Sequence, residues 1–157
     1  SSVKLNDISR IIRERFDVEL LLEGFRDLIK NLKLDYLFID THPGLNQETL
    51  ISLTTSDIVL LVIRPDQQDF QGTAVTVDVA RRLRVPKVLL MINKALKEYD
   101  FEDLQKQVEQ TYQTPVVGII PESEDLLRLG SGSIFYLSHP NHPITQALEK
   151  IAKKIMV

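Results

Sequence analysis

The sequence contains no cysteine and no tryptophan among its 157 residues. Without cysteine there is no disulfide bond, no thiolate catalysis and no zinc site with cysteine ligands. No apolar run reaches the roughly 18 residues that a membrane-spanning helix needs, and no signal peptide is visible. Charge of one sign is not in excess either: the formal net charge is −3, which gives no sign of a dedicated nucleic-acid surface.

A further absence concerns the glycine-rich loop G-x-x-x-x-G-K-[ST], which occurs nowhere in the chain. In that loop, backbone N–H groups and a lysine hold the phosphates of a bound nucleotide. The chain begins Ser1-Ser2-Val3 without a methionine, so we expect a fragment, a processed product or a trimmed form. A length of 157 residues with 43% hydrophobic residues suits one α/β domain, 1–157, with a real core.

Four short apolar runs predict the strands of a sheet. Apart from Asp35 and charged residues at their ends, the runs are apolar, which is typical of parallel strands that are covered on both faces. The runs are 34–40, 57–64, 87–92 and 116–120. Segments with helical spacing of apolar residues alternate with them, so the pattern predicts an open, mostly parallel sheet with right-handed crossovers and helices on both faces.

The helices are predicted from apolar residues at helical spacing and from capping residues. A first short helix contains Ile8, Ile11 and Ile12 on one face, and a second, capped by Asp17, has an apolar face that we expect to pack on the sheet. Five more helices are predicted. One begins after Asn46, one runs from about 71 to 84, and one has Phe101, Leu104, Val108 and Tyr112 on one face. A short one follows Ser123, and the last starts at about Pro143.

Polar loops follow all four predicted strands, at 40–44, 64–69, 93–96 and 121–123. In open parallel sheets, ligands bind beyond the carboxyl ends of the strands. Asp40 ends the first strand and Gly44 follows it; a carboxylate placed there can hold Mg²⁺ directly or through water. The glycine lets the next loop approach a phosphate closely. The arrangement therefore predicts a nucleotide-type site at this edge.

The stretch Asp40-Thr41-His42-Pro43-Gly44, followed by Leu45 and a helix, resembles the Walker B and switch II segment of the MinD/ParA family of deviant-Walker P-loop ATPases. The similarity continues to Pro121-Glu122 and covers most of the chain. It implies a three-layer P-loop NTPase-like fold that is incomplete at its N-terminal side, and it implies ATP and Mg²⁺ as cofactors of the complete protein.

The resemblance gives the residues of this stretch their expected roles. Asp40 would orient the water ligands of Mg²⁺, and Thr41 and Gly44 would belong to the catalytic switch that senses the γ-phosphate. A strand-end aspartate that caps the following loop is the alternative for Asp40. His42 departs from the small or proline residue expected at this position; a surface histidine is the simpler interpretation of it.

Asn93 and Lys94 indicate which nucleotide base the predicted site would bind. Related GTPases read guanine with an [NT]-K-x-D motif, whose aspartate accepts hydrogen bonds from guanine. The corresponding position here is Leu96, which accepts none. An asparagine amide can both donate to and accept from the N6/N7 edge of adenine. In the resembled family an asparagine after this strand contacts adenine; the alternative is a loop asparagine that satisfies backbone groups.

Three more residues are assigned to nucleotide binding by the resemblance. Pro121 and Glu122 are similar to a Pro-Glu-Asp segment that packs beside adenine and ribose, with Ser123 in the third place; a helix start is compatible with this role. Asp66 lies in a loop, Arg64-Pro65-Asp66, that is similar to one bordering the site and the dimer partner. A structural turn explains that loop equally well.

Two functions are carried forward. The first is the C-terminal part of a MinD/ParA-like ATPase, a nucleotide-gated dimeric switch in chromosome or plasmid partitioning or in cell-division positioning. We expect this chain alone not to hydrolyse ATP, because the P-loop is absent. The second is a non-catalytic α/β interaction module of the same descent. A receiver-like phospho-acceptor domain ranks below both, because an acidic pair for its Mg²⁺ is missing.

The resemblance also implies partners and a location. A homo-oligomer is expected, with a regulatory partner protein, in the cytoplasm or peripherally at membrane or nucleoid; membrane or DNA contact has no support in the residue pattern. Without a neighbouring P-loop strand, the strand 34–40 would have an exposed apolar edge. We therefore expect self-association or poor solubility, unless the strands 34–40 and 58–64 close the gap.

Overall fold

The computed structural model describes residues 15–156. Its sheet has three parallel strands in the order β1-β2-β3, which are Ile58–Ile63, Lys87–Ala95 and Val116–Pro121. The helices are α2 (Arg15–Leu32), α3 (Gln47–Thr55), α4 (Gln67–Arg82), α5 (Phe101–Tyr112), α6 (Glu124–Leu129), α7 (Phe135–Ser138) and α8 (Pro143–Ile155). The α/β fold with a parallel sheet, predicted from the alternation of runs, is confirmed.

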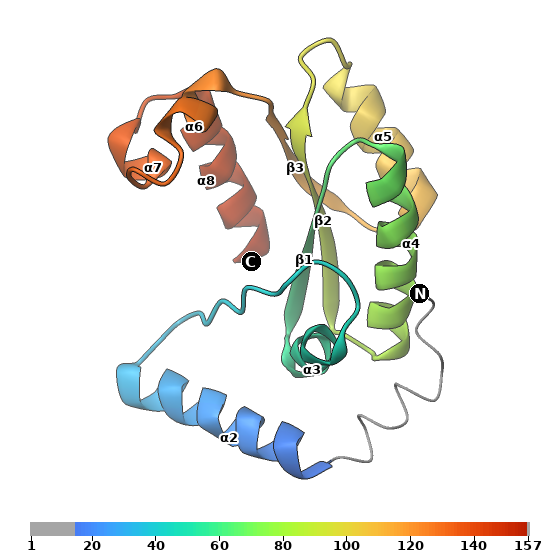
Figure 1. Ribbon diagram of the computed structural model, residues 1–157, viewed down its shortest axis with the longest axis vertical. Coiled ribbons are helices and arrows are strands. Elements are labelled where there is room, and N and C mark those ends of the chain that lie inside the picture. The colour runs from blue at the N-terminus through green and yellow to red at the C-terminus, as the bar shows by residue number, and fades with distance from the viewer. Residues whose placement is uncertain (1–14, 157) are drawn as a thin grey trace.

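Helices cover both faces of the sheet. Figure 1 shows α4 and α5 on one side of the strands and α8 on the other. The first face is formed by one set of alternate side chains, among them Ile63, Leu90 and Ile92, which pack with Val108 and Tyr112 of α5. The opposite set includes Leu89, Val117 and Ile120, which pack with Ile144 and Ile151 of α8. The period of two in β1 and β2 thus divides the core between two helical layers, whereas the irregular register of β3 places Val116 and Ile119 on one face and Val117 and Ile120 on the other.

Most helix boundaries are determined by capping side chains. The side-chain oxygens of Asn46, Asp66 and Asp100 accept N–H bonds in the first turns of α3, α4 and α5, and Ser123 does the same for α6. The predicted Asn46 and Ser123 caps are confirmed, whereas α4 begins at Gln67, earlier than expected. The predicted helix around Ile8 lies outside the described residues.

The segment 34–40 is not a strand, which corrects the sequence-based prediction. It forms an irregular coil that leads from α2 toward α3, and it pairs with none of the three strands. Phe38 in its centre is 83% exposed, and Tyr36 and Ile39 are exposed as well. A strand needs a neighbour to take up its backbone hydrogen bonds. No described segment provides one beside 34–40, so its apolar pattern alone cannot make it a strand.

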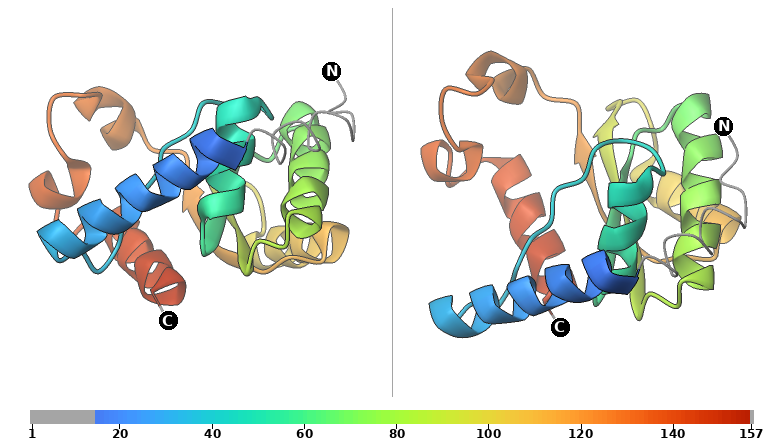
Figure 2. Two further views of the ribbon diagram at one scale, coloured as in Figure 1. Left: turned by 90° about the horizontal axis from the view of Figure 1, so that it is seen from below. Right: turned by 60° about the horizontal axis from the view of Figure 1, so that its bottom comes forward.

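The second correction concerns α2. The helix is present, but it begins at Arg15, so Asp17 lies inside it and is not its N-cap. Its expected apolar face does not pack on the sheet: Leu20, Leu21, Leu28, Ile29 and Leu32 are all exposed. Figure 1 shows α2 lying apart from the strands, and both views in Figure 2 show it crossing outside the layered core. The surface that this helix would cover is not formed by the described residues.

Candidate functional site

Polar residues meet at the carboxyl ends of β2 and β3. The parallel register places Asn93 opposite Ile120 and Ala95 opposite Pro121, with a bulge between Asn93 and Ala95. Lys94 lies in this bulge with a φ of 54°, a left-handed conformation that is uncommon for lysine. Bulges of this kind redirect side chains at the ends of strands and are frequent beside functional sites.

The Asn93 side chain has a local hydrogen-bond partner. Its Oδ1 accepts the N–H of Lys94 at 2.9 Å, and the residue is half-buried. This bond fixes the side chain in one orientation and supports the bulged backbone. The amide Nδ2 remains as a donor, and Oδ1 has a second lone pair. Asn93 therefore has both groups that an adenine edge requires, although part of its role is to hold its own loop.

Pro121 and Glu122 lie directly beside this bulge. The N–H of Glu122 donates to the carbonyl oxygen of Ala95 at 2.8 Å, which extends the β2–β3 contact past the last residue of β3. The carboxylate of Glu122 is exposed. Four of the sequence-predicted site residues, namely Asn93, Lys94, Pro121 and Glu122, are thus brought together by two adjacent strands.

Asp66 lies at the same edge of the sheet, after β1, and serves as the N-cap of α4. Its Oδ1 accepts the N–H groups of Gln68 and Asp69 at 3.1 and 2.9 Å, while Oδ2 lies 3.8 Å from Nε of Arg64. The Arg64 guanidinium also lies 3.5 Å from Asp69, whose carboxylate accepts the Arg64 N–H. These contacts make the loop a self-contained turn, the alternative that the sequence left open.

The segment that contains Asp40, Thr41 and Gly44 lies outside the sheet. All three residues are exposed and belong to the coil before α3, so a carboxylate at the end of a strand is not formed. Gly44 has a φ of 97°, a conformation that L-residues rarely adopt, so the turn into α3 depends on this glycine. The structure therefore separates the predicted switch residues from the cluster at the ends of β2 and β3.

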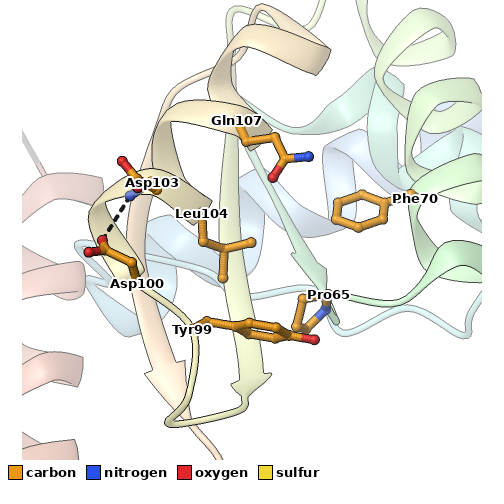
Figure 3. A pocket seen from close by; sticks show the side chains of 7 residues that line it. All are labelled: Pro65, Phe70, Tyr99, Asp100, Asp103, Leu104 and Gln107. Atoms are coloured by element: carbon orange, nitrogen blue, oxygen red, sulfur yellow. Dashed lines mark hydrogen bonds between the residues drawn. The ribbon is translucent and has the colours of Figure 1, made fainter.

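A cavity of about 320 Å³ opens between the start of α4 and the start of α5. Figure 3 shows the Tyr99 ring beside Pro65, with Phe70 entering from α4. Asp100 and Asp103 form its acidic side, and the Asp103 N–H donates to the Asp100 side chain at 3.1 Å. Two carboxylates repel phosphate groups. This cavity is not a phosphate cradle, and sequence reasoning missed it; the only local signal was an aromatic residue, Tyr99, in a polar loop.

Hydrogen bonds and an ion pair hold the side chains of Arg81, Arg82 and His142 within the fold. The Arg81 guanidinium donates to the carbonyl oxygens of Tyr112 and Gln113 at 2.6 and 2.7 Å, which terminates α5, and Arg82 pairs with Asp78 at 2.8 Å. His142 Nδ1 accepts the N–H of Ile144 at the start of α8. These contacts give Arg81, Arg82 and His142 structural roles at the ends of helices.

Across residues 15–156, no group of three or more histidine, aspartate or glutamate side chains is placed to hold a metal ion. In the same part of the chain, none of the helices is both long enough and apolar enough to cross a membrane.

Burial raises the pKa of Tyr112, whose hydroxyl donates to the Phe70 carbonyl at 2.8 Å; this tyrosine is a core residue.

Two curated proteins of Methanocaldococcus jannaschii, each described as an uncharacterized ATP-binding protein, are similar in sequence. One is 25% identical over 140 residues, which is 88% of this chain and 51% of the relative; the other is 23% identical over 143 residues, or 90% and 53%. The chain thus spans about half the length of these relatives. No protein-family model matches it.

Two solved structures from Aquifex aeolicus have the same fold. The cell division protein MinD aligns with a TM-score of 0.75 at 16% identity, covering 88% of this chain and 60% of MinD. A chain of the MinC:MinD cell division protein complex aligns with a TM-score of 0.74 at 17% identity, covering 88% and 59%. The chain therefore has the α/β fold of MinD, and in sequence it is related to ATP-binding proteins.

Proposed function

We propose that this chain is the base-binding part of a MinD-like ATPase. The observation that carries the proposal is the cluster of Asn93, Lys94, Pro121 and Glu122 at the carboxyl ends of adjacent strands. This is the edge at which open parallel sheets bind their ligands. The ATP-binding description of the two archaeal relatives supports the choice of nucleotide.

In this proposal, the Asn93 amide pairs with the N6/N7 edge of adenine while Pro121 and Glu122 pack beside the ring and ribose. Asp40, Thr41 and Gly44 would act only when their segment is held as a strand in the sheet, with Asp40 orienting the waters of Mg²⁺. The phosphates would be held by the glycine-rich loop that this chain lacks. The parent protein would then work as a dimeric, nucleotide-gated switch in partitioning or division.

The test is a thermal-shift titration of the chain with Mg-ATP, with Mg-GTP as the control nucleotide. We expect an upward shift with ATP alone, since ligand binding to the folded state raises stability. Asn93→Asp keeps an oxygen acceptor for the Lys94 N–H but removes the amide donor, so it should abolish the shift. Asn141→Asp, in the exposed loop before α8, makes the same change and adds the same charge, so it is the matched control and should keep the shift.

A second function, a non-catalytic interaction module, is favoured by one observation. Asp40, Thr41 and Gly44 lie in an exposed coil rather than at a strand end. If neither nucleotide shifts the melting temperature, and Asn93→Asp behaves like the unsubstituted chain, the base-binding proposal fails and this alternative takes its place. Equal shifts with ATP and GTP would also contradict adenine recognition by Asn93.

A further inference from the structure

The cavity between the start of α4 and the start of α5 is not used by the proposed nucleotide site. Its volume is about 320 Å³, which is at the small end of the range for ligand pockets. Pro65, Phe70 and Leu104 form its apolar side. The Phe70 ring is held in place, because it stacks on Tyr112 with the ring centroids 6.2 Å apart and the Phe70 carbonyl accepts the Tyr112 hydroxyl at 2.8 Å. This wall of the cavity is therefore preformed.

Tyr99 bounds the cavity on the side of the loop between β2 and α5. Figure 3 shows its ring nearly edge-on, beside Pro65 and below Leu104, so one face of the ring is turned toward the space between these side chains. The residue is 42% exposed, and its ring is in none of the aromatic pairs of the described structure. The face of a tyrosine ring is negative and attracts cations. This face is therefore available to a positively charged ligand.

The two carboxylates of the cavity can accept further hydrogen bonds. Oδ1 of Asp100 accepts the N–H groups of Glu102 and Asp103 at 2.9 and 3.1 Å, and Oδ2 has no partner among the described residues. Asp103 has one weak partner: Nζ of Lys106 lies 3.9 Å from its Oδ1, and both side chains are exposed. The cavity thus offers carboxylate oxygens to a ligand that carries several N–H donors.

The surroundings of the cavity are negative in charge. The segment 97–107, which contains the loop before α5 and its first turns, has four carboxylates and two lysines. The N-terminus of a helix has a partial positive charge of about half an elementary charge. Asp100, Glu102 and Asp103 at the start of α5 exceed it. Among the described residues that line the cavity, none is basic, so a cation is the complementary ligand.

We propose that this cavity binds the side chain of an arginine from a partner polypeptide. The guanidinium stacks on the free face of Tyr99 and donates to the carboxylates of Asp100 and Asp103, while the alkyl stem contacts Leu104. Arginine combines five N–H donors in one plane with the ability to stack on aromatic rings, and its stem is apolar. A lysine has the charge without the planar group. Arginine anchors that fill pockets contribute strongly to protein interfaces.

The residues around the cavity favour a polypeptide over a free amino acid or a metal ion. A free arginine has a carboxylate of its own, for which the described lining provides no basic partner, whereas an arginine within a polypeptide has none. No group of three metal-binding side chains exists in the described part of the chain. The inference goes beyond the proposed function, because the cavity residues do not include Asn93, Lys94, Pro121 or Glu122.

The first test is an NMR titration of the chain, without nucleotide, with the blocked tripeptide acetyl-Gly-Arg-Gly-amide. We expect saturable shifts of the amides of residues 99–103, and binding about fivefold or more tighter than that of acetyl-Gly-Lys-Gly-amide. An absence of saturable shifts, or equal affinity for the two peptides, would overturn the proposal. Tighter binding of free L-arginine than of the blocked peptide would also overturn it, because the occupant would then be a metabolite.

Two substitutions in the first turn of α5 test whether the cavity itself makes the contact. Asp100→Asn keeps an oxygen that can cap α5 but removes the charge, so it should weaken binding of the arginine peptide by about tenfold. Glu102→Gln removes the same charge at an exposed residue that does not line the cavity, so this matched control should change the affinity less than about twofold. Equal effects of the two would indicate a general attraction to a negative surface and contradict the proposal.

Two substitutions of Tyr99 test the contact with the ring. Tyr99→Leu keeps an apolar side chain but removes the π face, so it should weaken binding about fivefold, whereas Tyr99→Phe should retain the affinity. The position is exposed in a loop, so we expect both variants to melt close to the unsubstituted chain. Undiminished binding by the folded Tyr99→Leu variant would show that the peptide lies elsewhere and would overturn the proposal.

Discussion

At the scale of single residues, Gly118 determines how closely α8 approaches β3. A methyl group at this position would lie 2.5 Å from Cγ1 of Ile151, which is itself buried. Such an overlap forces side chains from their preferred rotamers or shifts the helix. The glycine is needed here for space, since its φ is not in the left-handed range.

We therefore expect Gly118→Ala to lower the free energy of unfolding by about 1–3 kcal/mol, as measured by urea denaturation. Gly72→Ala is the matched control: nothing lies within 4 Å of its added methyl group, and it is in the interior of α4. This control should be neutral or stabilising by up to about 1 kcal/mol. Equal effects of the two substitutions would show that α8 does not pack on β3 as described.

Two buried threonines differ in one respect. Thr145 Oγ1 donates to the His139 carbonyl at 2.6 Å, whereas Thr49 Oγ1 is buried without a partner among the described residues. An unsatisfied buried hydroxyl lowers stability, since it has lost its bonds to water. The Thr49 hydroxyl therefore destabilises this fold, while that of Thr145 connects the start of α8 to the preceding turn.

We expect a Thr→Val substitution to change the free energy of unfolding in opposite directions at the two positions. Thr49→Val should raise the free energy of unfolding by about 1 kcal/mol, and Thr145→Val should lower it by about 1–3 kcal/mol. Chemical denaturation of the two variants would measure both changes, and the shape of the side chain is nearly unchanged in each case. Destabilisation by Thr49→Val would mean that its hydroxyl has a partner outside the described residues.

At the scale of elements, α2 and α3 differ in how far their leucine side chains are buried. Leu50 of α3 is buried against Val59 of β1, whereas Leu20 of α2 is 64% exposed. Leu→Ala removes the same atoms at both positions. It should cost about 2–5 kcal/mol at Leu50, where a cavity is left, and no more than about 0.5 kcal/mol at Leu20.

Thermal or chemical unfolding of the two variants measures this difference. A large loss of stability in Leu20→Ala would show that α2 packs on apolar surface in solution, contrary to its exposed position here. A small loss would confirm that the apolar face of α2 makes no stabilising contact in this chain.

At the scale of the whole molecule, we expect this chain alone to show negligible Mg-dependent ATP hydrolysis. The glycine-rich phosphate loop is absent from its sequence, and that loop supplies much of the electrostatic stabilisation of a transferring phosphoryl group. Phosphate release measured with Mg-ATP should not exceed that of a heat-inactivated sample. Robust turnover by the purified chain would contradict this expectation and would show that the phosphates are held without the glycine-rich loop.

The sequence by itself determined the elements whose stability is local. The caps at Asn46 and Ser123 and the apolar spacing of Phe101, Leu104, Val108 and Tyr112 each act within a few residues, and the corresponding helices are present. The runs that became β1, β2 and β3 were also identified, since each has at least one partner in the chain. Local pattern also indicated the polar residues that follow Ile92, but it placed Asn93 in a loop, whereas β2 continues through Ala95 with a bulge at Lys94.

Only the tertiary structure decided what happens to the run 34–40 and to the apolar face of α2. Both have the pattern of buried elements, but burial requires a neighbour that is distant in sequence, and the described chain supplies none. For the same reason Asp40, which follows an apolar run in the sequence, does not lie at the end of a strand beside Asn93 and Pro121. A pattern states what a segment can bury, whereas the fold determines whether a partner is there to bury it.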